Sequence, residues 1–229
     1  MDALPNYGLA NTVTGFCTLF AGLMPLLFST LTTPHPPRWM LVYWLILITG
    51  IFTVTLHGFG ETNPILGERW MWAFLDTGSN IVVVWGIARA VLIDYYRPET
   101  QRWALPVVTL LMILGVAWHF VDKWNATHGA YVIGFGDWGG FRPGQTWLIG
   151  FSVLATVLFF VQRAQIAAAP MRILLLMTGM FLCGLLLATA KNSQIVYPFI
   201  PMHALWHVVG AFGFIALWFF NELRFPQRS

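Results

Sequence analysis

The chain has 229 residues, of which 58% are hydrophobic and 9% are charged, with a formal net charge of +3. Soluble domains carry about 25% charged residues, so this composition predicts a protein that faces lipid over most of its surface. The modest and scattered positive charge excludes nucleic acid as a partner.

Seven apolar stretches are each long enough to cross a membrane, because about 20 helical residues span the hydrocarbon layer. The predicted spans cover residues 8–30, 39–59, 70–93, 103–121, 146–163, 170–190 and 199–221. Their apolar character is continuous and does not alternate, which argues against a membrane barrel. The sequence therefore predicts an all-α integral multi-pass membrane protein, a seven-helix bundle that forms a single domain over residues 1–229.

The lysines and arginines predict how this bundle is oriented. Four precede the first span or follow an even-numbered one: Arg69, Lys123, Arg142 and Lys191. The other eight lie in or beside the odd-numbered loops and the C-terminus: Arg38, Arg89, Arg97, Arg102, Arg163, Arg172, Arg224 and Arg228. Positive residues concentrate on the cytoplasmic side, so we expect an outside N-terminus and a cytoplasmic C-terminus.

The first span begins without a positively charged leader, so it is predicted to be a retained helix and not a cleaved signal. Cys17 and Cys183 both fall inside predicted spans. They are expected to be small buried hydrophobic residues without a disulfide. His35 lies in the proline-rich turn after the first span and is expected to contact water.

Three polar side chains fall near the outer ends of the second and third spans. His57 is close to the end of the second span, Thr53 precedes it by one helical turn, and Asp76 is near the start of the third. Ionisable residues inside a membrane are costly and are usually functional. Each also has a structural interpretation: an interhelical hydrogen bond for His57, a contact with Asn80 for Asp76, and a bond to its own helix for Thr53.

The fourth loop, residues 122–145, is unusually long and alternates glycines with aromatic residues. Such loops usually have a function, so a lid over the outer mouth of the bundle is one hypothesis. An aromatic segment that lies along the membrane interface is the other. His119 and His128 flank the start of this loop and are expected to be interface or loop residues.

The last span begins with His203 and His207, whose spacing of four places both imidazoles on one face of a helix. With His57 they supply three imidazoles at the same membrane depth, on the non-cytoplasmic side. Catalytic zinc sites use three protein ligands and keep one position open. Asp76 would then be the general base toward water and the general acid toward the leaving group, while the Thr53 hydroxyl assists an oxyanion.

These residues also carry a resemblance to a known family. Residues 203–213 read HALWHVVGAFG, which resembles the last-helix motif of the alkaline ceramidases, His-Ala-x-Trp-His followed by glycines. The wider superfamily, with adiponectin receptors and hemolysin III relatives, has Ser-x-x-x-His in helix two and an Asp in helix three. Here residues 53–57 read TVTLH and residues 75–76 read LD, and NTVT at 11–14 resembles the family's Asn-Thr-x-Ser-Asn in helix one.

The resemblance implies a zinc-dependent intramembrane hydrolase that cleaves the amide bond of a ceramide-like membrane lipid to a fatty acid and an amine. His57, His203 and His207 would hold Zn²⁺, Asp76 would be the acid and base, and Thr53 would assist. Two features depart from the family. Thr53 replaces the serine, and only Asp2 precedes the first helix, which gives little support for a structural Ca²⁺ ion.

Other functions fit parts of the same pattern. A lipid-binding receptor or sensor without turnover would use Asp76 as a fourth ligand to close a structural metal site. A haem protein would use two of the histidines as axial ligands. A retinal protein is disfavoured because the lysines, Lys123 and Lys191, fall outside the last span.

Overall fold

The computed structural model describes residues 7–31, 34–58, 68–128, 143–188 and 200–225. These residues form the helices α1 (Tyr7–Leu31), α2 (Pro37–Gly58), α3 (Arg69–Tyr95), α4 (Pro98–His128), α5 (Pro143–Val161), η2 (Arg163–Gln165), α6 (Ala168–Ala188) and α8 (Met202–Arg224). All but the short η2 are long and apolar enough to cross a membrane. The prediction of an all-α protein with seven spans is confirmed for this part of the chain, while its orientation and its single domain stay predictions.

Proline marks the beginning of several helices. Pro37, Pro98 and Pro143 are the first residues of α2, α4 and α5, and Pro201 directly precedes α8. This placement is favourable because the first helical residue has no intrahelical partner for an N–H group, and proline has none to lose. Of these starts, that of α8 carries His203 and His207, while α3, which carries Asp76, begins at Arg69 without a proline.

Helix α4 extends beyond the predicted span at both ends. Its 31 residues correspond to about 46 Å at about 1.5 Å per residue, which exceeds a hydrocarbon layer of about 30 Å. Residues 122–128 of the predicted long loop are therefore helical, and residues 143–145 belong to α5. The hypothesis of a lid falls on residues 129–142, outside the described residues.

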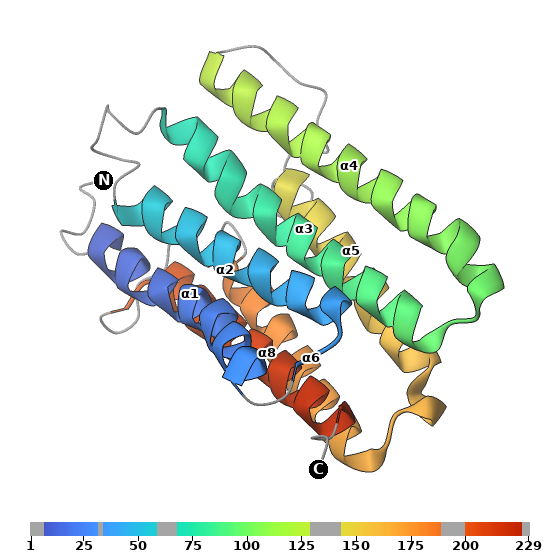
Figure 1. Ribbon diagram of the computed structural model, residues 1–229. Helices are drawn as coiled ribbons and strands as arrows, with labels where there is room; N and C mark the ends of the chain where they lie inside the picture. Colours follow the sequence, from blue (N-terminus) through green and yellow to red (C-terminus); the bar gives the residue numbers. More distant parts are fainter. Residues whose placement is uncertain (1–6, 32–33, 59–67, 129–142, 189–199, 226–229) are drawn as a thin grey trace.

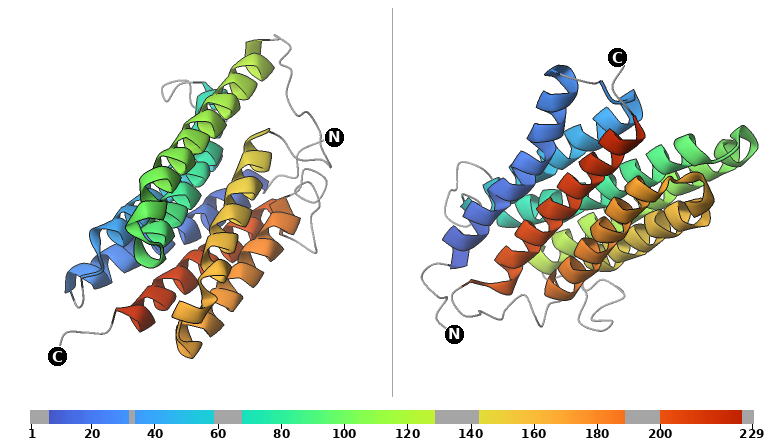
Figure 2. Two further views of the ribbon diagram at one scale, coloured as in Figure 1. Left: turned by 90° about the vertical axis from the view of Figure 1, so that its right-hand side faces the viewer. Right: turned by 90° about the horizontal axis from the view of Figure 1, so that it is seen from below.

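Neighbouring helices pack in a defined order (Figures 1 and 2). Helix α1 packs against α2 and α8, α2 against α3, α3 against α4 and α5, and α6 against α8. The beginning of α1 and the end of α8 lie at opposite ends of the bundle. This order brings the end of α2, the start of α3 and the start of α8 to the same end of the molecule.

Helix α2 lies between α1 and α3 and buries one face. Its buried residues recur with helical spacing: Trp39, Val42, Tyr43, Ile46, Thr49, Gly50, Thr53 and Leu56. Two glycines let α1 approach α2 closely. A Cβ added at Gly22 would lie 2.3 Å from the Leu47 nitrogen, and one at Gly50 would lie 2.3 Å from the Leu19 Cα. Such close backbone approach is typical of helices packed inside membranes.

The outer surface of the bundle is apolar. Leu110, Ile113 and Leu114 of α4 and Leu182 and Leu186 of α6 all expose about half or more of their area. A continuous exposed apolar surface of this kind fits a lipid-facing protein.

The cysteines are free, with Cys17 half-buried and Cys183 exposed on α6. The absence of a disulfide between them agrees with the prediction. Burial of Cys183 was predicted wrongly, because its side chain lies on the outer face of α6 and not against α8.

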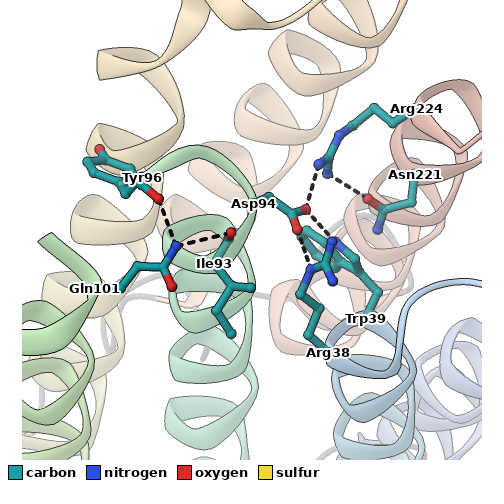
Figure 3. Close-up of polar contacts among 8 residues, drawn as sticks. All are labelled: Arg38, Trp39, Ile93, Asp94, Tyr96, Gln101, Asn221 and Arg224. Carbon is teal, nitrogen blue, oxygen red and sulfur yellow. Dashed lines mark hydrogen bonds and ion pairs between the residues drawn. The ribbon is translucent and has the colours of Figure 1, made fainter. Parts of the chain in front are cut away.

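A polar cluster joins α2, α3 and α8 at the end of the bundle where α8 finishes (Figure 3). The Asp94 side chain is 2% exposed, and its carboxylate accepts hydrogen bonds from Arg38, from Trp39 Nε1 at 2.8 Å and from Arg224. Buried carboxylates require such compensation, because an unpaired charge is costly. Nearby, Gln101 caps the end of α3 by donating to the Tyr96 carbonyl at 2.7 Å.

His35 belongs to the same end of the bundle and is only 3% exposed. Its Nδ1 lies 2.8 Å from the Tyr43 hydroxyl, and its Nε2 lies 3.1 Å from Glu222 Oε1. The predicted contact with water is therefore wrong. The proline-rich turn folds His35 inward between α2 and α8, which the sequence around it does not reveal.

Candidate metal centre

The three predicted histidines converge at the other end of the bundle. His57 comes from the last turn of α2, and His203 and His207 come from the first two turns of α8. The Nε2 atoms of His57 and His203 are 3.4 Å apart, and one ligand nitrogen from each of the three residues lies within 4.8 Å of the others. Among the described residues, this is the group of histidine, cysteine and carboxylate side chains whose spacing suits a metal ion.

The three rings fit a tetrahedral zinc ion. Zinc binds imidazole nitrogens at about 2.0–2.1 Å, which sets neighbouring ligand nitrogens about 3.3 Å apart in a tetrahedron. The distance between His57 and His203 is already close to this value. Ring centroids 4.9–5.2 Å apart show that the third imidazole, His207, is equally near both. The donor set therefore fits zinc with only small side-chain adjustment.

Asp76 and Thr53 form a pair beside the histidines. The Thr53 hydroxyl donates to the Asp76 carboxylate. It also lies 3.0 Å from the Thr49 carbonyl of its own helix. The predicted role of Thr53, to assist a developing oxyanion, stays a prediction, and in the structure its hydroxyl is bonded to Asp76. Asn80 contacts the backbone of Asp76, where its side-chain amide donates to the carbonyl oxygen at 2.9 Å.

A cavity connects this pair with the histidines. Its lining includes Thr53 from α2, Asp76 from α3, and His207 and Trp206 from α8. An adjoining cavity shares Asp76 and Trp206 and reaches His203. Asp76 is thus part of the cavity wall, while the atoms grouped for metal binding come from the three histidines. His207 and His203 line these cavities together with Asp76.

The cavity continues into an apolar space between α3, α5 and α6. Val84, Ser152 and Phe181 line both the cavity at the histidines and a deeper one, which adds residues such as Ile87, Phe159 and Met177. The polar groups therefore lie at one end of a connected series of spaces and the apolar ones at the other. Such a gradient suits a molecule with a polar head and a hydrocarbon chain.

The two other predicted outer histidines lie away from this centre. His119 is 1% exposed and packs beside Phe74, with ring centroids 5.7 Å apart. It is therefore a buried residue of α4, and the prediction that it lies at the interface or in the loop is wrong. His128 is exposed at the end of α4 and stacks on Trp124, with ring centroids 4.0 Å apart, while its place at the membrane interface stays a prediction.

One contact of the centre was not predicted. Thr14 of α1 lies 3.2 Å from the Nδ1 atom of His207. The motif at residues 11–14 was the available signal, but it does not indicate which helix Thr14 contacts.

Comparisons of the chain with protein-family models, with curated proteins and with solved structures find no match. The relationship to the alkaline ceramidases therefore stays a prediction from the motifs.

Proposed function

We propose that the chain is a zinc-dependent intramembrane hydrolase that cleaves the amide bond of a ceramide-like lipid. The observation that carries the proposal is the convergence of His57, His203 and His207 beside the paired Asp76. Motifs at residues 203–213 and 53–57 support the relationship to alkaline ceramidases. On the predicted orientation, the centre faces the non-cytoplasmic side.

The chemistry divides between the bound metal and the residues of the chain. A zinc ion held by the three histidines would supply Lewis-acid polarisation and lower the pKa of water. Asp76 is positioned to accept a proton from water and to return it to the departing amine. Thr53 holds the carboxylate in the cavity wall through its hydroxyl. The apolar space between α3, α5 and α6 supports a lipid chain as the hydrophobic part of the substrate.

The position of Asp76 favours hydrolysis over a closed structural metal site. A closed site needs four protein ligands, and Asp76 is the carboxylate that the sequence offers. Its side chain instead pairs with Thr53 and lines the cavity. A haem is disfavoured, because three imidazoles 4.9–5.2 Å apart leave no space for a macrocycle between two of them.

The proposal is tested by zinc content and by lipid-amide hydrolysis in the same preparations. We expect about one zinc per wild-type chain and release of fatty acid from ceramide in mixed micelles. His207→Ala should lose both, because two imidazoles hold zinc far more weakly than three. The matched control is His128→Ala, which removes an exposed histidine of α4 and should change neither.

Two results would contradict the proposal. If wild-type protein stays zinc-free after reloading, the three histidines do not hold zinc and a zinc-dependent hydrolysis is ruled out. Stoichiometric zinc with stable lipid binding and no product over a long incubation would instead support a receptor or sensor.

A further inference from the structure

The contact between Thr14 and His207 joins α1 to the candidate metal centre. Thr14 Oγ1 lies 3.2 Å from His207 Nδ1, and the two residues are 193 positions apart in sequence. An imidazole can bind a metal through only one of its nitrogens at a time, and the hydrogen bond of the other nitrogen fixes which one carries the proton. The direction of this hydrogen bond therefore matters for metal binding.

The hydrogen bonds of Thr14 determine that direction. Its hydroxyl has one hydrogen, which it donates to its own helix, with the Ala10 carbonyl at 2.8 Å and the Asn11 carbonyl at 3.3 Å. The oxygen of the hydroxyl then has only lone pairs left for other partners. The Ala10 carbonyl, at 2.8 Å, is nearer to the hydroxyl than His207 Nδ1, at 3.2 Å, and takes its hydrogen, so the oxygen accepts at His207.

The geometry points to Thr14 as a positioning residue that keeps the proton of His207 on Nδ1 and leaves the Nε2 lone pair free for zinc. The backbone of α1 holds the Thr14 hydroxyl in place, and this hydroxyl keeps His207 in the tautomer with a protonated Nδ1. The Nε2 atom of His207 is then the nitrogen that is available to the metal. Burial strengthens this control, because His207 is 5% exposed and water has little access to it. The Asn11 backbone of the same helix is a further hydrogen-bond partner of His207. The inference rests on the proposed function for its metal and adds a role for α1.

Three variants of α1 isolate the hydroxyl of Thr14. Thr14→Val removes the hydroxyl and keeps the shape, while Thr14→Ser keeps the hydroxyl and removes the methyl. Thr12→Val is the matched control, because Thr12 Oγ1 makes the same kind of bond to its own helix, to the Gly8 carbonyl at 2.8 Å. The expected effect of losing such a supporting contact is a loss of metal affinity of about 10–100-fold.

The first measurement is zinc affinity by competition with a chromophoric chelator, without substrate. We expect Thr14→Val to bind zinc about tenfold or more weakly than wild type, with Thr14→Ser and Thr12→Val close to wild type. Equal affinity of Thr14→Val and wild type would overturn the role of Thr14 while leaving the proposed hydrolase intact.

The second measurement does not need the metal. Nitrogen NMR of metal-free protein labelled with ¹⁵N-histidine, with His207→Ala to assign the signal, reports which nitrogen is protonated. We expect a protonated Nδ1 in wild type and a shift of the proton toward Nε2 in Thr14→Val. A protonated Nε2 in wild type would overturn the inference, even if the protein proved unable to bind zinc and the proposed function failed.

Discussion

At the scale of single residues, the proposed function assigns metal binding to the three histidines and proton transfer to Asp76, which is paired with Thr53. The carboxylate belongs to the cavity wall, and the histidines hold the candidate metal position. A change at Asp76 should therefore affect turnover without removing the metal. We expect this because the Asp76 side chain bonds to Thr53 and lines the cavity.

We predict that Asp76→Asn keeps its zinc and loses turnover by about 10²–10⁴-fold, the usual contribution of a general acid or base. The amide keeps the shape of the side chain and can still accept from Thr53, but it cannot take a proton from water. The measurement is kcat for ceramide hydrolysis together with metal content. Asp122→Asn, a carboxylate of α4 outside the cavity linings, should leave both unchanged. Full turnover in Asp76→Asn would refute the role of Asp76.

Contacts within one helix were predictable from the sequence, and contacts between helices mostly were not. The spacing of four predicted that His203 and His207 share a face, because the α-helix repeats every 3.6 residues. The counting of spans predicted that His57 and Asp76 reach the same end of the bundle. The contacts between Thr14 and His207 and between Tyr43 and His35 depend on which helices become neighbours, and no local pattern determines that.

At the scale of the helices, the crossing of α1 and α2 determines where Thr14 lies relative to the histidines. Gly22 and Gly50 allow this crossing, because each faces the backbone of the other helix at less than the distance a side chain needs. Helix α1 therefore approaches α2 closely enough to reach α8 as well. The two glycines therefore help to set the position of α1, which carries Thr14 to His207 of the candidate metal centre.

We predict that Gly50→Ala lowers the free energy of unfolding by about 1–3 kcal/mol, the usual cost of overpacking. The added Cβ would lie 2.3 Å from the Leu19 Cα, so one backbone must move. Thermal unfolding in detergent measures the effect. The control is Gly150→Ala on α5, where an added Cβ meets nothing within 4 Å and stability should not fall. Equal melting temperatures for the two variants would contradict the close crossing.

At the scale of the whole molecule, two polar clusters occupy opposite ends of an otherwise apolar bundle. The histidines and Asp76 lie at one end, and the cluster around Asp94 lies at the other. In the second cluster Arg224 also donates to Asn221 Oδ1 at 3.0 Å, and the Asn221 amide donates to the Tyr43 hydroxyl at 3.0 Å. The Tyr43 hydroxyl keeps its own hydrogen and can donate it to His35 Nδ1. In that direction the bond requires a neutral His35.

We predict that this requirement makes stability depend on pH. Burial lowers the pKa of His35 below its ordinary value of 6.5, although Glu222 opposes the shift and Arg224 adds to it. The unfolded chain therefore takes up the proton at higher pH than the folded chain. The contribution of His35 to the free energy of unfolding is fully present above about pH 6.5. It decreases below that pH, by at most about 1.4 kcal/mol per pH unit.

Melting temperatures between about pH 8 and pH 5 measure this dependence. His35→Gln should flatten the decrease on the acidic side, because glutamine does not titrate. The exposed His128→Gln should reproduce the wild-type profile. A wild-type profile that His35→Gln leaves unchanged would assign the acid sensitivity to another group.

The exposed thiol on α6 makes the neighbourhood of the cavity accessible to spectroscopy. Cys183 points away from the bundle, while Phe181 and Leu185 of the same helix line the cavity beside His207. With Cys17 replaced by alanine, a nitroxide or fluorophore on Cys183 would occupy a single native position on the outer face. Its signal would report whether α6 moves outward when a lipid chain enters, without any cysteine having to be introduced.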